Sequence, residues 1–306
     1  MKNQRSPAAE SGVTLVELMI AITISMLILL AITQLYLSSY STQKSQDDST
    51  RLNESARFSF DLISRELRKA GFRNNWETGS TSPVFCSAQA VSDSNAGPSM
   101  LGKNDPATVD PATADFSGGT QVAISNSSDV LRVRYFGEGT AGTSDVADCH
   151  GYPVARDVLV EDTLFVAADP NNGNEPALWC NSTNTTRAGV TTNRGKIALV
   201  AGVESMQFLY GEDTDADGIV NQYLPWRTGV TVADNILGVK ASVVVRGPNN
   251  NNVVSNSTFQ HFSASYPSVA NSDSGAVFTA PSDAHLRKLF STETATRNFR
   301  YCDALN

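Results

Sequence analysis

Three aspartates stand at alternate positions in DTDADGIVN, residues 213–221, and a glycine follows them. Asp213, Asp215 and Asp217 offer oxygen ligands suited to one hard cation, and Gly218 permits the sharp turn of such a loop. Carboxylates this close together repel one another unless a cation neutralises them. The spacing is that of the first half of an EF-hand loop, so the segment is a candidate calcium site with a structural role.

The rest of the pattern fits calcium less well. Ile219 would offer its backbone carbonyl, and Asn221 its side chain or a bridging water. The twelfth position is Leu224, where a bidentate acid is expected, so the site would be weaker or would be completed by Glu212 or Glu204. The alternative is an acidic turn between two strands, because Asp and Gly are ordinary turn residues.

A second residue that needs a chemical explanation is Glu17, the one residue with a charge at neutral pH in an apolar stretch from Val13 to about Leu37. A helix of this length spans a bilayer, and a carboxylate inside such a span is costly, although less so near one end. If the chain were cut after Gly12, the α-amine of Val13 would lie about one helical turn from Glu17. The two groups would then pair, within one subunit or between adjacent subunits.

The segment before the apolar stretch carries Lys2 and Arg5, as the start of a signal sequence does. The stretch is longer than the apolar core of a signal peptide, and no small-residue cleavage site follows it, so we expect it to be retained as an anchor. The positive charges on its N-terminal side predict that this end stays in the cytoplasm and the rest lies outside.

The chain has four cysteines, Cys86, Cys149, Cys180 and Cys302, and none belongs to a CxxC pair or to a zinc-type spacing. An even number of cysteines in an exported domain predicts two disulfides. Three pairings are open, and four buried thiols are the alternative.

The helix that carries Glu17 is expected to continue, because residues 38–51 contain no proline or glycine. Arg68 and Lys69, with Gly71 just beyond them, are typical of a helix C-terminus. The sequence predicts one helix from about 13 to 70, roughly 85 Å long. Its second half has an apolar stripe at helical spacing that should pack against a core: Leu52, Ala56, Phe60, Ile63 and Leu67.

After Gly71 the apolar pattern changes to period 2, without further helical patterns. This predicts an α+β fold in which the long N-terminal helix packs on a C-terminal antiparallel β-sheet head domain. Residues 75–119 and 267–284 are rich in small and polar residues and are expected to be long loops. The candidate strands are 120–125, 129–136, 162–168, 196–203, 205–211, 238–247 and 258–265.

Composition narrows the class of function. The 306 residues carry a net charge of -8, which argues against direct contact with nucleic acid. Neither a nucleophile elbow, a P-loop, a zinc-protease motif nor a dinucleotide-binding glycine pattern occurs. The three histidines lie in dissimilar contexts, and His261 is expected on a sheet surface. We therefore predict no catalytic residues and no enzyme activity.

The segment SGVTLVELMIAITI, residues 11–24, resembles the class III signal of type IV prepilins and of type II secretion pseudopilins. This resemblance implies that a prepilin peptidase cleaves after Gly12 and methylates Val13, where phenylalanine is usual. It also implies that Glu17 helps to recruit the subunit into a helical filament. The implied segments are a leader at 1–12, a transmembrane or filament-core helix at 13–37, an extracytoplasmic amphipathic helix at 38–71 and a β-rich head at 72–306.

Further segments resemble the PilW family of minor type IV pilins: residues 55–72, 199–223, 238–247 and 285–298. The resemblance implies a pilin-like fold and a protein that primes pilus assembly or sits in the tip complex, in support of twitching motility, adhesion or DNA uptake. The implied partners are prepilin peptidase, the major pilin, other minor pilins and a PilY-type tip adhesin. The chain would cross the inner membrane once, with its head in the periplasm, and then move to the pilus at the cell surface.

Two alternatives stay open at this point. A J-type pseudopilin of a type II secretion system shares the leader and the fold, although the acidic loop and the C-terminal segment favour PilW. A membrane-tethered receptor or enzyme would use the apolar helix only as an anchor, and Glu17 would then be dispensable.

Overall fold

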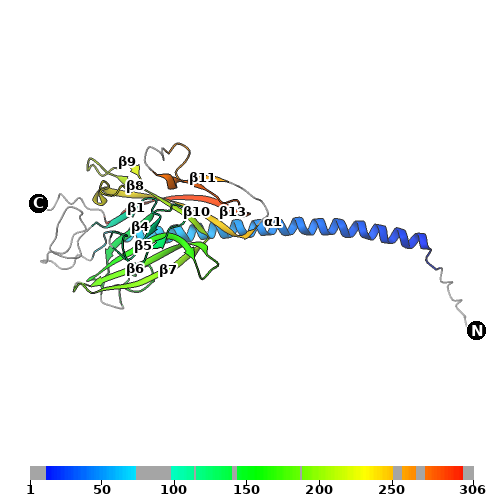
Figure 1. Cartoon of the computed structure of the whole chain (residues 1–306), viewed down its shortest axis with the longest axis horizontal. Coiled ribbons are helices and arrows are strands. Elements are labelled where there is room, and N and C mark those ends of the chain that lie inside the picture. Colours follow the sequence, from blue (N-terminus) through cyan, green and yellow to red (C-terminus); the bar gives the residue numbers. More distant parts are fainter. Residues whose placement is uncertain are drawn as a thin grey trace, which may run out of the picture. The chain divides into compact units, whose positions relative to one another are not determined.

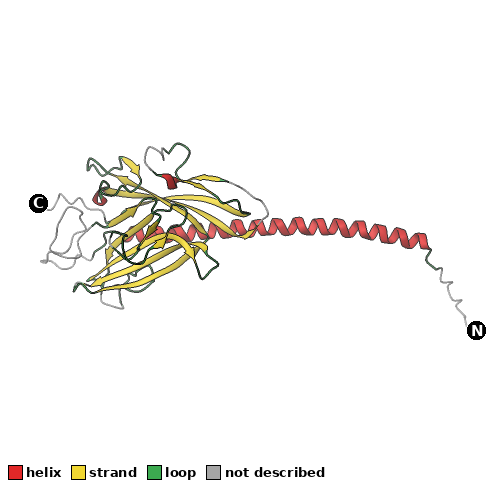
Figure 2. Cartoon of the chain, in the orientation of Figure 1, coloured by secondary structure: helices red, strands yellow, loops and turns green. Residues whose placement is uncertain are grey.

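The computed structural model describes residues 12–73, 98–113, 115–139, 143–186, 188–250, 257–266 and 273–298. One long helix, α1 (Leu15–Lys69), precedes the strands (Figures 1 and 2). The contacts within the chain divide it into two compact units, residues 1–47 and residues 48–306. The described strands and short 3-10 helices are β1 (Met100–Lys103), β2 (Thr108–Val109), β3 (Val122–Ala123), β4 (Val130–Phe136), β5 (Val158–Asp169), β6 (Glu175–Thr186), β7 (Thr191–Ala201), β8 (Val203–Glu212), β9 (Gln222–Leu224), η1 (Ala233–Asn235), β10 (Ile236–Asn250), β11 (Thr258–Gln260), η2 (Ser274–Ala276), β12 (Val277–Thr279) and β13 (His285–Ala295).

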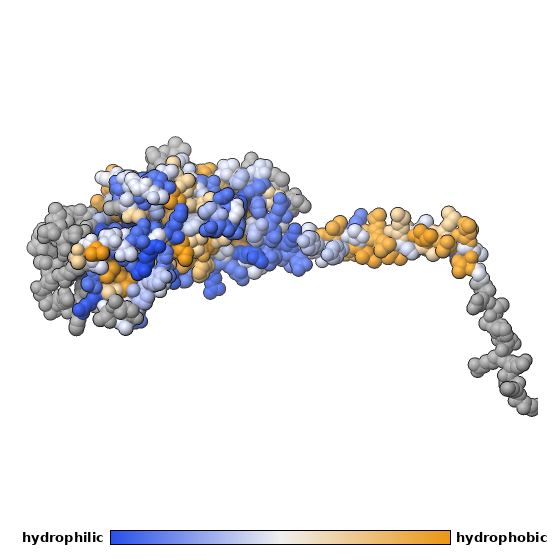
Figure 3. All heavy atoms as spheres, turned by 60° about the horizontal axis from the view of Figure 1, so that its bottom comes forward, coloured by the Kyte–Doolittle hydropathy of each residue, from blue (hydrophilic) through white to orange (hydrophobic). Residues whose placement is uncertain are grey.

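In the first unit, α1 is predominantly apolar on every side up to about Leu37. Each residue from 12 to 43 is exposed, and the segment is long and apolar enough to cross a membrane (Figure 3, orange). The hydroxyls of Thr23, Ser25 and Thr33 donate hydrogen bonds to carbonyls three or four residues earlier. These polar groups are therefore satisfied within the helix, as a lipid environment requires.

The second unit contains two antiparallel sheets. Their strand orders are β1-β4-β5-β6-β7 and β13-β10-β8-β9 (Figure 1). The pairs β2-β3 and β11-β12 form separate two-stranded sheets. One hydrophobic cluster joins both sheets to the predicted stripe of α1, of which Leu52, Ile63 and Leu67 are fully buried. The predicted α+β fold, with a long helix packed on antiparallel sheets, is thus confirmed.

Gly202 is the single residue between β7 and β8, and it marks the change from one sheet to the other. Its φ of +82° lies in the left-handed region, and a Cβ there would stand 2.7 Å from the carbonyl oxygen of Arg246. Only glycine fits such a close approach without strain. The sequence predicts a single strand from 196 to 203, and this prediction is wrong. The strand ends at Ala201, and Val203 already belongs to the next strand, which lies in the other sheet.

The C-terminus of α1 is closed by a distant side chain. Asn298 Nδ2 donates hydrogen bonds to the carbonyl oxygens of Arg68 and Ala70, at 3.1 and 3.0 Å. Gly71 has a φ of +71°, as expected for the residue after a helix. Helix ends leave carbonyls without intrahelical partners, and here the segment after β13 supplies the missing donor.

Several strands were missed by the sequence analysis, among them β6 and β13. The second half of β6 reads NSTNTT, without the apolar alternation that predicts strands, yet Asn181, Ser182 and Thr183 are buried. β1 lies in a segment that was expected to be a loop. The predicted strand 258–265 shortens to β11, and the strand predicted at 120–125 shortens to β3.

His261 is buried and does not lie on a sheet surface as predicted. Its ring nitrogens lie 3.0 Å from Ser205 Oγ and from Ser242 Oγ, and burial lowers its pKa to about 3. The hairpin β11–β12 covers this part of β10, where Phe278 packs on Val244. The ring is therefore a neutral core residue that joins the hairpin to the sheet.

Candidate functional site

The first candidate site is the N-terminal end of α1. Gly12, Val13 and Thr14 precede the helix, and Thr14 Oγ1 accepts a hydrogen bond of 3.3 Å from the backbone N–H of Glu17. Threonine is a favoured residue at this capping position. Val13 is 73% exposed, and Glu17 is exposed as well.

Glu17 also forms no ion pair within the described part of the chain. A bare carboxylate in the first turn is favourable for the helix dipole, but in lipid it still requires a cation. The cleavage at Gly12, the methylation of Val13 and the assembly role of Glu17 stay predictions.

The second candidate site is the acidic loop between β8 and β9. One carboxylate oxygen from each of Asp213, Asp215 and Asp217 lies within 4.8 Å of the others, with Asp213 buried and the other two exposed. Asp213 Oδ2 accepts a hydrogen bond of 2.9 Å from the N–H of Gly218, whose φ is +86°. Asp213 Oδ1 accepts another, of 2.8 Å, from the N–H of Ala216. The loop thus gathers the three predicted acids in a sharp turn.

The other predicted ligands are arranged differently. Asn221 Oδ1 accepts hydrogen bonds from the backbone N–H and the hydroxyl of Thr214, at 2.6 and 3.0 Å. Ile219 is 66% exposed. Both acids that were considered for completing the site already bind arginines: Glu212 pairs with Arg227 at 3.0 Å, and Glu204 pairs with Arg287 at 2.5 Å. Calcium at this loop therefore stays a prediction that rests on the three aspartates.

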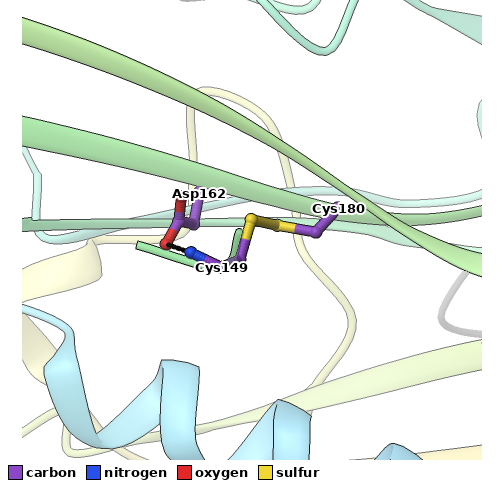
Figure 4. Close-up of side chains that lie close together, drawn as sticks. All are labelled: Cys149, Asp162 and Cys180. Atoms are coloured by element: carbon purple, nitrogen blue, oxygen red, sulfur yellow. Dashed lines mark hydrogen bonds between the residues drawn. A yellow bond between two sulfur atoms is a disulfide. The ribbon is translucent and has the colours of Figure 1, made fainter. Parts of the chain in front are cut away.

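The third feature is a disulfide between Cys149 and Cys180, so disulfide formation is confirmed for this pair. The bond joins the segment before β5 to β6, across a Cα–Cα distance of 6.4 Å. Figure 4 shows Asp162 of β5 beside it, where Asp162 Oδ2 accepts a hydrogen bond of 3.0 Å from the N–H of Cys149. The other two predicted cysteines, Cys86 and Cys302, lie outside the described residues.

Asp162 also connects the disulfide to α1, through hydrogen bonds that involve Tyr135 and Lys69. Tyr135 Oη donates a hydrogen bond of 2.6 Å to Asp162 Oδ2, and Lys69 Nζ donates to Tyr135 Oη and to the carbonyl of Ala147, at 3.0 Å each. Lys69 Nζ also pairs with Glu66 Oε2 at 2.5 Å. Two carboxyl groups, on α1 and on β5, therefore share one ammonium group in the interior, next to the disulfide.

Burial raises the pKa of Glu66 to about 8; Lys69 opposes this shift, and Asp162 adds to it. Burial and the neighbouring Asp162 also raise the pKa of Tyr135, so its hydroxyl remains a hydrogen-bond donor. The sequence analysis missed this network. Glu66 reads as a charged residue beside the apolar stripe, and nothing in its local pattern shows that Leu62 and Glu66 are buried as deeply as the stripe itself.

Comparison with known families gives two matches. Residues 163–298 match the family described as Type IV pilus-assembly protein W, and residues 7–33 match the prokaryotic N-terminal methylation motif. Comparison with curated proteins gave no match.

Among solved structures, the chain is similar to a type IV-like pilin from Thermus thermophilus, with 14% sequence identity and a TM-score of 0.44. That similarity covers 82% of this chain and 100% of the other. The two family matches confirm the resemblance inferred from the sequence. The chain thus carries a C-terminal region that matches the type IV pilus-assembly protein W family and a prepilin-type methylation motif at its N-terminus.

Proposed function

We propose that the chain is a minor pilin that is cut between Gly12 and Val13 and enters a type IV pilus through its N-terminal helix. The methylation motif at residues 7–33 carries this proposal, together with the exposed apolar helix segment 15–37 that it partly covers, in which Glu17 is the single acid. The leader would be residues 1–12, and residues 13–37 would lie in the membrane and then in the filament core. Residues 38–71 and the head at 72–306 would lie outside the cytoplasm.

Cleavage would supply the cation that Glu17 lacks. The α-amine of Val13 would lie four residues before Glu17, about one helical turn away, and methylation would keep its positive charge. In a low-dielectric filament core, this amine would pair with the Glu17 carboxylate of a neighbouring subunit and thereby fix the axial position of the incoming helix. Before assembly, Lys2 and Arg5 would keep the N-terminus in the cytoplasm.

The finer role that we propose is structural and not enzymatic. The protein would prime pilus assembly or form part of the tip complex, together with the major pilin, other minor pilins and a PilY-type adhesin, in support of twitching motility, adhesion or DNA uptake. The match of residues 163–298 to the pilus-assembly family supports this role over that of a J-type pseudopilin. A membrane-tethered receptor would not need the acid at position 17.

The test follows the chain from processing to the filament. We expect the protein to be shorter in cells that contain prepilin peptidase than in cells without it, to begin with methylated Val13, and to be present in sheared pili. Glu17→Ala should leave processing intact but reduce incorporation at least tenfold, whereas Glu17→Asp should retain part of it. An unchanged size in both strains contradicts the pilin proposal. Processed protein that is absent from pili but required for secretion favours the pseudopilin.

A further inference from the structure

An amine and two carboxyl groups meet in the interior at the C-terminal end of α1. Lys69 Nζ lies 2.5 Å from Glu66 Oε2 and 3.6 Å from Asp162 Oδ2. Both acids are buried, and the Lys69 side chain is only 15% exposed. A primary amine is therefore held beside a carboxyl group where little water is present, and such proximity strongly favours a reaction between the two groups.

The two oxygens of Asp162 have different surroundings. Oδ2 accepts hydrogen bonds from Tyr135 Oη at 2.6 Å and from the backbone N–H of Cys149 at 3.0 Å. Oδ1 is buried, and it has no hydrogen-bond partner among the described residues. Two donors aimed at one oxygen form the arrangement that stabilises the oxyanion of a tetrahedral intermediate in acyl transfer. Oδ2 is thus placed to hold the negative charge of such an intermediate, and Oδ1 is placed to leave.

Glu66 is placed to move protons. Its carboxyl group contacts the amine of Lys69 directly, and burial raises its pKa to about 8. Asp162 adds to this shift, so the two carboxyl groups lie near one another. A carboxyl group whose pKa lies near neutral pH can both accept a proton from an amine and donate it to a leaving oxygen.

A plain buried ion pair is the alternative, and it explains less of this site. It leaves Asp162 Oδ1 buried without a hydrogen bond, which costs free energy. It also leaves one ammonium group between two buried carboxyl groups. A bond between Lys69 and Asp162 would remove one positive and one negative charge together, and Glu66 would keep its proton.

We propose that Lys69 and Asp162 form an isopeptide bond in the folded chain, with Glu66 as the proton carrier. Nζ gives a proton to Glu66 and attacks Cγ of Asp162, and Oδ2 takes the negative charge of the intermediate. Two of the three ammonium protons pass through Glu66 to Oδ1. The Cγ–Oδ1 bond then breaks, and Oδ1 leaves as water. The third proton stays on the amide nitrogen, and Glu66 returns to its initial state.

This reaction would take place once in each chain and is a modification of the protein itself. The bond would join the last helical residue of α1 to β5, next to the disulfide between Cys149 and Cys180. In the filament proposed above, force on α1 would then reach the head through a covalent bond as well as through packing.

Mass spectrometry of the intact full chain tests the bond. The protein is produced in cells without prepilin peptidase, purified in detergent and reduced, so that neither processing nor a disulfide changes its mass. We expect the unmodified chain to weigh less than its sequence predicts, by the mass of one water molecule. Lys69→Arg and Glu66→Gln should each have their full calculated mass. The first variant lacks the nucleophile and the second lacks the proton carrier, while both keep a side chain of similar size.

The peptides of a protease digest are the second measurement. Tandem mass spectrometry should identify one branched peptide that joins Lys69 to Asp162. Lys240 and Glu293, an exposed pair 3.9 Å apart, are the internal control and should be recovered in separate peptides. The branched peptide of the unmodified chain decides the matter if a variant fails to fold.

The proposal is wrong if the unmodified chain has its full calculated mass, or if Lys69 and Asp162 are recovered only in separate peptides. It is also wrong if the folded Lys69→Arg variant lacks the mass of a water molecule, since the water would then be lost elsewhere. Loss of water from folded Glu66→Gln would contradict the role of Glu66.

Discussion

Lys69 Nζ, at the last helical residue of α1, lies 2.5 Å from Glu66 Oε2 and supplies the cation nearest to this buried carboxyl group. The same ammonium lies 3.6 Å from Asp162 Oδ2 on β5. One positive charge thus serves two carboxyl groups, and this network joins the helix to the sheet. The protonation state of the Glu66 carboxyl group should therefore change with pH in a range where most glutamates do not titrate.

The first prediction concerns that pH dependence. The Glu66 carboxyl titrates at its ordinary value of 4.5 in the unfolded chain and at about 8 in the folded one. The folded state therefore favours the protonated form. The stabilising contribution of this group is complete below pH 4.5, decreases as the pH rises and is lost above about pH 8. We expect Glu66→Gln to reduce the decline in melting temperature between pH 5 and pH 8.5.

Glu54→Gln is the matched control, since Glu54 lies on an exposed face of the same helix. Melting followed by circular dichroism across the pH range should give parallel curves for Glu54→Gln and the unmodified chain. A Glu66→Gln curve parallel to both would show that this carboxyl does not take up a proton on folding.

The second prediction concerns the disulfide. Replacing both Cys149 and Cys180 by serine should lower the free energy of unfolding by about 2–4 kcal/mol, because the unfolded chain loses a cross-link. Cys149 also positions an N–H for Asp162, so amide hydrogen exchange should rise at residues 146–149 in particular. Urea unfolding of the variant and of the oxidised chain measures the first effect. Equal midpoints for the two proteins would contradict it.

The large elements could be predicted from the sequence because each has a regular local pattern. Leu52, Ile63 and Leu67 repeat at helical spacing, and all three are buried as expected. Residues 205–211 and 238–247 have the alternating or β-branched pattern that is typical of strands, and they lie in β8 and β10. By contrast, β6 ends in polar residues that are buried only because β5 and β7 flank them on both sides, and no local pattern records which strands will be neighbours.

The candidate sites also divide into those that a local sequence pattern predicts and those that only the folded chain assembles. The acids at 213, 215 and 217 are adjacent in sequence and are also adjacent in space. Glu66, Asp162 and Tyr135 come from three elements, α1, β5 and β4, that are far apart in the sequence. Such groups are assembled by tertiary contacts, and a single sequence without aligned relatives holds no signal that joins them.

The third prediction concerns calcium at the acidic loop. Asp215→Ala should abolish the calcium uptake of this loop and the accompanying rise in melting temperature. The reason is that the three clustered carboxylates repel one another, and calcium removes that repulsion. Asp61→Ala, at an exposed acid of α1, should leave both effects unchanged. Equal calcium uptake with and without Asp215 would identify the loop as a plain acidic turn.

The last prediction separates folding from assembly on α1. Ile63 is fully buried in the cluster that joins the helix to both sheets, whereas Phe58, about one and a half turns away, is 51% exposed. Ile63→Ala should therefore lower the free energy of unfolding by about 2–5 kcal/mol, because it leaves a cavity in the core. Phe58→Ala should change it by no more than about 0.5 kcal/mol, as is usual for exposed sites. Urea unfolding of the two variants in the same detergent measures both values.

Incorporation of the same two variants into sheared pili then has a clear meaning. A loss with Ile63→Ala reflects an unstable head, whereas a loss with a stably folded Phe58→Ala reflects a contact made by the exposed helix face in the filament. Exposed apolar side chains alongside charged ones are common where proteins meet, and Phe58 lies among Glu54, Arg57 and Asp61. We therefore expect Phe58→Ala to reduce incorporation while the melting temperature stays unchanged. Normal incorporation of Phe58→Ala would exclude this face from the contacts between subunits.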